Sequence, residues 1–259
     1  MKQLFTFIFI ILLTIEASGQ IYTDINQLTN MGVDIPPQDL LGFGIGNCDL
    51  ELIKSAITKG ADINYKPEIN GTFPLCSAIT GAVSAVLPAE ESIMANQIRD
   101  EGSVVYSGRS LSDLRRDYIA IIRFLLQKGA KATVSSELSF EDNPFLLAAK
   151  CHNIEIIRIL LDFKADPNTR DYAGFTALHL LGLPYPVSYP HKNSPEIAKL
   201  LLSKGAKMTK CSENDDTPLT LAKSSLNTIT SNELSWKDYP CYNELVNSIK
   251  SLIDIYSKL

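Results

Sequence analysis

Cysteine and histidine are the residue types in this sequence that could supply a nucleophile and its base. Cys151 and His152 are adjacent, which places a thiol next to an imidazole. Successive residues at the end of a helix point in different directions, so these two side chains are not expected to meet. Nothing in the sequence indicates a carboxylate that would orient His152. We therefore interpret the pair as structural and predict no catalytic residue.

An acidic stretch, "SENDDT" at residues 212–217, is the strongest candidate for a cation site. A calcium-binding loop alternates its ligands and has a central glycine and a closing glutamate. This stretch lacks that arrangement. We interpret it as a solvated loop tip, and we expect neither a metal nor a cofactor.

The first 19 residues are unlike the rest of the chain. They contain one lysine near the start, an apolar run over residues 4–15 that two threonines interrupt, and small residues at 17–19. As a helix that run would span about 18 Å, well short of the ~30 Å hydrocarbon core of a bilayer. We therefore expect a cleaved signal peptide at 1–19 and a mature domain at 20–259.

The predicted export signal and the composition limit the possible locations and functions of the protein. The ending "SGQ" is similar to signals of exported proteins in some Gram-negative bacteria, which implies a periplasmic or secreted protein. No later segment is long enough to span a membrane, so we expect no membrane insertion after cleavage. The chain of 259 residues is 45% hydrophobic and can bury a sizeable core, and its net charge of -5 argues against nucleic-acid binding.

A short phrase recurs along the chain and defines its organisation. Each copy follows an amphipathic helical run, and the copies are separated by 69, 35 and 41 residues: "KGAD" at 59–62, "KGAK" at 128–131, "FKAD" at 163–166 and "KGAK" at 204–207. A shorter apolar segment precedes each run. The pattern predicts four helix pairs and a terminal fifth, at 38–60, 72–129, 143–164, 175–205 and 216–259. Glycine ends three of the second helices in a left-handed turn, so Lys164 should adopt that conformation too.

These repeats, with "TALH" at 176–179, resemble the ankyrin repeat over almost the whole mature chain. The resemblance implies an all-α ankyrin-repeat α-solenoid of about five helix pairs with β-hairpin fingers, and a structural, hydrogen-bonding role for His179. The first spacing is much longer than the repeat. We interpret its extra length, about 81–116, as an insertion between the two helices of one pair.

The five cysteines fall in different repeats of this arrangement. Cys76 and Cys211 lie towards the fingers, and Cys48, Cys151 and Cys241 lie towards the opposite end. Repeats in such stacks are about 10 Å apart, whereas the Cα atoms of a disulfide lie within about 7 Å. We therefore expect no regular disulfide framework.

The resemblance implies a protein-binding module without catalytic activity, acting as a scaffold, an inhibitor or an immunity-type protein, and we expect a monomer. An enzyme whose site is formed by the 81–116 insertion is the alternative. Variable finger positions usually carry the recognition, and tyrosine and arginine dominate binding hot spots. The predicted partner-binding residues are Arg170, Tyr172, Phe175, Tyr65, Lys66, Glu68, Lys210 and Glu213. We expect Tyr172 and Phe175 to be exposed, so that neither matters for stability.

Overall fold

The computed structural model describes residues 34–66, 71–84, 109–134, 138–184, 191–211, 215–231 and 242–259. The predicted signal peptide lies outside these residues, as do Glu68, Glu213 and Cys241. Most of the predicted insertion is also outside them. Its described ends are helical, because residues 81–84 complete one helix and residues 111–116 begin the next.

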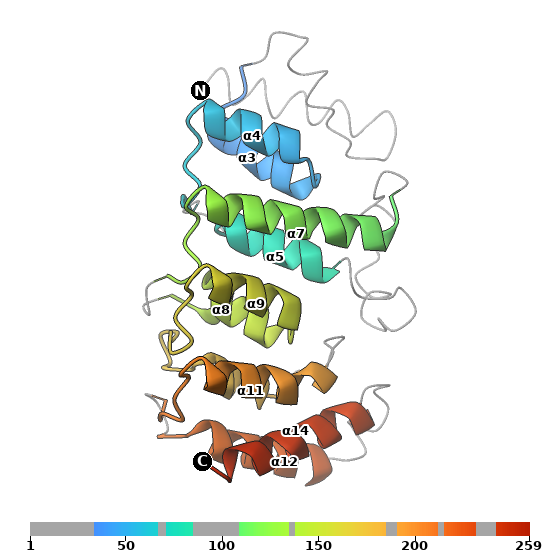
Figure 1. Ribbon diagram of the computed structural model, residues 1–259, viewed down its shortest axis with the longest axis vertical. Coiled ribbons are helices and arrows are strands. Elements are labelled where there is room, and N and C mark those ends of the chain that lie inside the picture. The colour runs from blue at the N-terminus through green and yellow to red at the C-terminus, as the bar shows by residue number, and fades with distance from the viewer. Residues whose placement is uncertain are drawn as a thin grey trace.

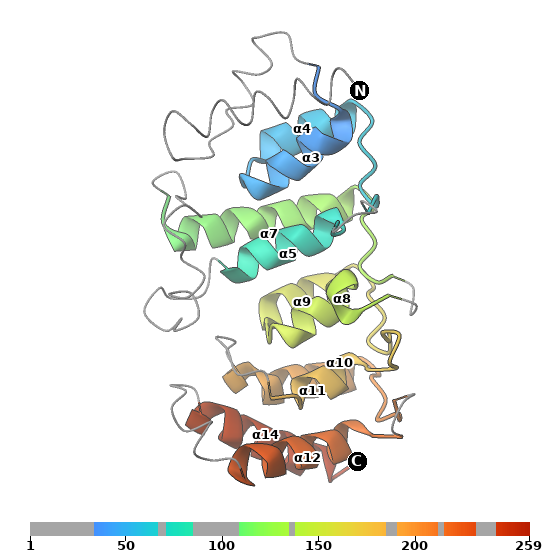
Figure 2. The same cartoon turned by 180° about the vertical axis from the view of Figure 1, so that it is seen from behind.

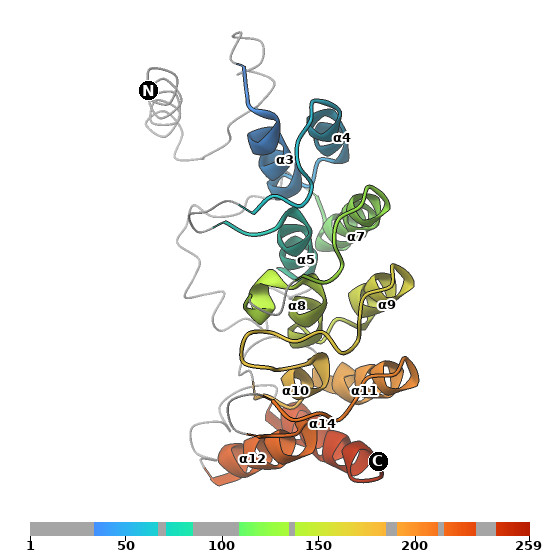
Figure 3. The ribbon, with the colours of Figure 1, turned by 90° about the vertical axis from the view of Figure 1, so that its left-hand side faces the viewer.

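The described residues form five antiparallel helix pairs stacked in one direction (Figure 1, Figure 2). The pairs are α3 (Pro37–Gly46) with α4 (Leu50–Thr58), α5 (Pro74–Ser84) with α7 (Leu111–Gln127), α8 (Pro144–Lys150) with α9 (Ile154–Asp162), α10 (Ala177–Leu181) with α11 (Ser194–Ser203), and α12 (Pro218–Ser231) with α14 (Tyr242–Tyr256). Short 3-10 turns, η1 (Phe140–Asp142) and η2 (His191–Asn193), precede α8 and α11. Figure 3 shows the first helices of four pairs in one column and their partners in a second column. The predicted all-α solenoid is confirmed.

The loops that join one pair to the next run along one edge of the stack (Figure 1), and each such loop is called a finger below. They contain no β-strand in the part of the chain that the structure describes, so the predicted β-hairpins are not formed there. A β-hairpin needs a ladder of backbone hydrogen bonds between its two sides, and the described finger has too few of them. In the finger at 171–175, the N–H of Asp171 donates to the carbonyl of Phe175 at 3.1 Å, and one such bond does not make a ladder.

Side-chain caps start several of these helices. The Asn143 side chain accepts hydrogen bonds from the N–H groups of Phe145 and Leu146, and Pro144 occupies the first helical position, where its missing N–H costs nothing. Asn153 caps α9 in the same way. These polar residues satisfy the N–H groups that have no partner within the helix, and they set where each short helix begins.

Lys164 has a φ of 62°, as predicted, and it occupies the position that Gly60, Gly129 and Gly205 hold in the other repeats. Its N–H donates to the carbonyl of Leu161, and the N–H of Ala165 donates to the carbonyl of Leu160 at 2.9 Å. This pair of bonds is the Schellman motif, which requires a left-handed residue just past the helix end. The local hydrogen bonds therefore impose the same backbone on lysine as on glycine.

One hydrophobic core runs through the first four pairs, and a smaller cluster lies between α12 and α14. Tyr256 of α14 belongs to the larger core, and its hydroxyl donates to the carbonyl of Leu178 at 3.1 Å. The terminal pair is thereby attached to the pair before it. Within the described ranges, no helix is both long enough and apolar enough to cross a membrane.

Candidate partner-binding surface

An Asp-x-Asn phrase at 62–64 and at 166–168 holds the finger that contains it to the next repeat. The Asp62 carboxylate accepts the N–H of Asn64 at 2.8 Å. The Asn64 amide then donates to the carbonyl of Gly129 and accepts the N–H of Lys131. A single asparagine thus satisfies two backbone groups of the following finger and joins the two fingers.

The same arrangement recurs two repeats later. Asp166 accepts the N–H of Asn168 at 2.8 Å, and the Asn168 amide bonds to the carbonyl of Gly205 and to the N–H of Lys207. The phrase is therefore structural. It positions the residues that follow it, and these include the predicted binding residues Tyr65, Arg170 and Tyr172.

Tyr172 lies at the tip of a tightly held finger and is 66% exposed. Its backbone N–H donates to the carbonyl of Leu138 in the preceding loop at 3.1 Å. The Asp171 carboxylate accepts the N–H of Phe175 at 2.8 Å, and Gly174 closes the turn with a φ of 83°. An exposed aromatic ring is thus presented on a fixed backbone, so little backbone entropy remains to be lost on binding.

Arg170 is half-buried and braces two fingers. Its guanidinium donates to the carbonyl of Lys210 at 2.9 Å and, at 3.4 Å, to the carbonyl of Gly174. The bond to Lys210 connects residues 40 positions apart in the sequence. The structure therefore gives this predicted binding residue a role within the stack.

Phe175 is half-buried, and the expectation that it is exposed was wrong. Its ring packs against the hydrophobic core, with its centroid 5.6 Å from that of the His179 ring. The turn at Asp171 directs residue 175 back over the start of α10. Since this side chain covers the core, its truncation should cost stability.

His179 has the structural role that its motif implied. Its Nδ1 accepts the backbone N–H of Thr176 at 3.1 Å, and its Nε2 lies 3.1 Å from the carbonyl of Asp216 in the next finger. Because Nδ1 accepts, Nε2 carries the hydrogen and donates to Asp216. Burial lowers the pKa of this imidazole below its usual value.

The predicted binding residues on the neighbouring fingers, Tyr65, Lys66 and Lys210, differ in their exposure and in the contacts that they already make. Tyr65 is 43% exposed. Lys66 forms an ion pair with Asp142 at 2.7 Å and lies 5.9 Å from the centroid of the Phe73 ring, so much of its charge is already compensated. Lys210 is exposed and pairs with Asp215 at 3.4 Å. Tyr65 and Tyr172 are therefore the predicted residues whose rings remain available.

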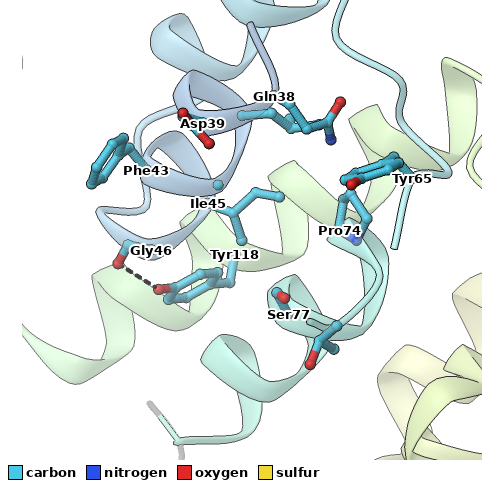
Figure 4. A pocket seen from close by; sticks show the side chains of 12 residues that line it. Gln38, Asp39, Phe43, Ile45, Gly46, Tyr65, Pro74, Ser77 and Tyr118 are labelled. Atoms are coloured by element: carbon cyan, nitrogen blue, oxygen red, sulfur yellow. Dashed lines mark hydrogen bonds between the residues drawn. The ribbon is translucent and has the colours of Figure 1, made fainter. Parts of the chain in front are cut away.

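A groove next to Tyr65 was not predicted from the sequence. It has a volume of about 940 Å³ and lies between α3, the start of α5 and a side chain of α7 (Figure 4). Its lining residues are Gln38, Asp39, Leu41, Gly42, Phe43, Ile45, Gly46, Tyr65, Thr72, Pro74, Ser77 and Tyr118. The sequence signal that could have indicated it is the glycine-rich helix "LLGFGIG" at 40–46, where glycine is unfavourable.

Comparison with known proteins bears directly on these repeats. Residues 114–181 match the family model described as ankyrin repeats in three copies. The fold is an ankyrin-repeat solenoid. An alignment over 97 residues, which covers 34% of this chain and 18% of the other protein, shows 39% identity to an ankyrin repeat protein of fowlpox virus. Ankyrin repeats generally mediate protein–protein interaction, which agrees with a binding surface on the fingers.

The ankyrin stack also brings together a buried polar cluster that the sequence did not indicate. The Ser194 hydroxyl lies 2.8 Å from Nδ1 of His152, and the rings of His152 and His191 are 4.4 Å apart. Ser248 of α14 donates to the carbonyl of His191 at 2.7 Å. Burial, together with the neighbouring His191, holds the pKa of His152 well below its usual range.

This serine–histidine pair resembles a nucleophile with its base, but its environment is unsuited to catalysis. Ser194 and His152 are both fully buried, so a substrate could not reach the hydroxyl. The cluster instead joins the third repeat to the fourth and to the terminal helix. The adjacent residue considered from the sequence, Cys151, is also buried.

The other thiols that the structure describes are also buried. Cys48, Cys76 and Cys211 are buried free cysteines, and burial raises the pKa values of the Cys48 and Cys76 thiols. Such thiols are poor nucleophiles. Among the residues that the structure describes, no group of three or more histidine, cysteine, aspartate or glutamate side chains could hold a metal ion.

Proposed function

We propose that this chain is a protein-binding module whose partner contacts the finger edge of the ankyrin stack, with Tyr172 at the centre of the contact. The observation that carries the proposal is the exposed Tyr172 ring on a backbone held by the Leu138 carbonyl and by the Asp171 turn. Large aromatic side chains with a polar end dominate binding hot spots. A ring that is already positioned loses little conformational entropy on binding.

The surroundings of Tyr172 supply a polar rim. Lys210 and Asp215 are exposed on the following finger, and Tyr65 is exposed on an earlier one. An aromatic centre with charged residues around it is the usual composition of a transient protein interface. Arg170 contributes indirectly, because its bonds to the carbonyls of Gly174 and Lys210 fix the spacing of the two fingers.

The proposal includes the location and the role of the chain. The apolar start of the sequence supports export, to the periplasm or to the outside of the cell. A scaffold, an inhibitor and an immunity-type protein all require a stable surface and no chemistry of their own. The thiols and histidines that the structure describes are all buried, which supports a non-catalytic role.

The test begins with capture of the partner by the tagged mature chain from the exported fraction of the source cells. Calorimetry with the captured partner should show that Tyr172→Ala weakens binding by about 1–3 kcal/mol, or roughly 5- to 150-fold. The thermal midpoint should not change, because the Tyr172 ring is mostly exposed. Lys199→Ala, an exposed change on the second-helix side of the stack, is the matched control and should bind normally.

Phe175→Ala is included to distinguish a loss of stability from a loss of partner binding. Because the Phe175 ring packs on the core but is not fully buried, its loss should lower the free energy of unfolding by about 1–3 kcal/mol. A partner that binds Tyr172→Ala as tightly as the unaltered chain would place the contact elsewhere and contradict the proposal.

A further inference from the structure

The groove beside Tyr65 has the shape and charge of a peptide site. Leu41 and Ile45 of α3, Pro74 of α5 and Tyr118 of α7 form its apolar walls (Figure 4). The Tyr118 hydroxyl donates to the carbonyl of Gly46 at 3.3 Å, which keeps that ring in place. Resting on the proposed protein-binding function, we propose that this groove receives an extended segment of the partner in which a lysine or arginine adjoins a large apolar residue.

The groove accounts for two of the glycines in α3, a helix that glycine makes less stable. Gly44 is needed for packing, since a Cβ there would lie 2.8 Å from a side-chain carbon of Ile53. Gly42 and Gly46 have no such neighbour, because a Cβ on either would meet nothing within 4 Å, and neither has a positive φ. Both weaken α3 relative to alanine, and both line the groove. Because these glycines have no side chains, the groove has room for the backbone of an extended partner segment.

The charge of the groove favours a basic ligand. Asp39 is the one charged residue among its lining residues, and it is exposed. The neighbouring Gln38 amide is already used, because it donates to the carbonyl of Asp62 and accepts the N–H of the same residue. The Asp39 carboxylate has no ion pair or hydrogen bond with any residue that the structure describes, and the exposed Tyr65 ring offers a face to a guanidinium or ammonium group.

A segment of the chain's own insertion is a poorer complement to this groove. Residues 85–108 carry four acidic residues, at 90, 91, 100 and 101, and one arginine at 99, which makes their net charge 1 − 4 = −3. A segment with that balance would be repelled by Asp39. A basic partner segment would instead be attracted both by Asp39 and by the net charge of -5 on the whole chain.

The experiment uses the full mature chain and a synthetic array of octapeptides that combine arginine or lysine with leucine or phenylalanine. A second array replaces every basic residue with glutamate. We expect the basic array to bind about tenfold more tightly, and Asp39→Asn to reduce that preference about two- to fivefold. Gly42→Leu should fill the groove and weaken peptide binding at least about tenfold while leaving the thermal midpoint unchanged or higher, since leucine is the better helix former.

Ser55→Leu is the matched control, because it adds the same side chain to an exposed position of α4 outside the groove. It should bind the peptides normally. The proposal is overturned if neither array binds, if the acidic array binds as well, or if Gly42→Leu binds like the unaltered chain. Failure here with a partner still sensitive to Tyr172→Ala would leave the proposed function intact, whereas failure to capture a partner would remove both.

Discussion

Replacing Lys164 with glycine should stabilise the protein, although it removes a side chain. Lys164 has a φ of 62° at the end of α9, where three other repeats have glycine. A residue with a Cβ pays a steric penalty in the left-handed region, and glycine does not. The Lys164 side chain is exposed and has no ion pair or hydrogen bond with any residue that the structure describes, so little is lost with it.

The magnitude follows from two opposing terms. Removing the steric strain of the left-handed conformation should raise the free energy of unfolding by about 1–2 kcal/mol. The unfolded chain gains freedom from the new glycine, which costs about 0.4–1 kcal/mol. The net gain in the free energy of unfolding should therefore be about 0.5–1 kcal/mol, equivalent to roughly 1–4 °C in the thermal midpoint of a domain of this size.

Urea unfolding followed by circular dichroism measures the effect, provided that the slope of the transition is unchanged. Gly129→Ala is the matched reverse change. Its φ is 97° and a Cβ there would meet nothing within 4 Å, so only backbone strain should act. That variant should lose about 1 kcal/mol. Lys164→Ala, which keeps the strained backbone, should not show the gain.

A lower urea midpoint for Lys164→Gly would refute this reasoning. It would mean that the end of α9 depends on the lysine side chain rather than on the Schellman bonds of Lys164 and Ala165. A gain in Lys164→Ala as large as in Lys164→Gly would also contradict it, because alanine keeps the Cβ that causes the strain.

Two further predictions concern the core. A Cβ at Gly81 would lie 2.4 Å from the Tyr118 ring, so Gly81→Ala should lower the free energy of unfolding by about 1–3 kcal/mol in urea, and a Tyr118→Ala background should remove most of that added loss. Burial lowers the pKa values of His152 and His179. The folded chain therefore binds fewer protons than the unfolded chain below about pH 6.5, and stability present above that pH should be lost as the pH falls towards the lowered pKa values. For the fully buried His152 the loss should be about 1.4 kcal/mol per pH unit. His152→Asn, which suits the left-handed backbone there, should flatten the slope between pH 6.5 and 5.5, and an unchanged slope would assign it to other groups.

The helix pairs and their turns could be predicted from the sequence because local bonds define them. The motif at Lys164 joins residues five or fewer positions apart, and Asn143 caps a helix two and three residues ahead. The "TALH" bonds of Thr176 and His179 are equally local. Interactions of this range depend on residue type and spacing, so a repeated phrase is sufficient to place them.

The exposure of the predicted partner-binding residues could be predicted only in part. Tyr65 and Tyr172 are exposed at the positions that the repeat pattern assigned to the fingers. Arg170 and Phe175 are half-buried, because one bonds to the carbonyl of Lys210 in the next finger and the other packs over His179. Which finger residues face solvent depends on how adjacent repeats close over them, and the sequence of one repeat does not contain that information.

The sequence by itself determined the repeats, the helix ends and the left-handed Lys164, since each depends on hydrogen bonds within a single turn of chain. Only the tertiary structure decided the contact of Ser194 with His152 across 42 residues, and the groove that α3 forms with α5 and Tyr118. The physical reason is that these features depend on the side-chain volumes of neighbouring repeats. Stacking brings those volumes together, and a pattern of residue types along one repeat cannot specify how closely they meet.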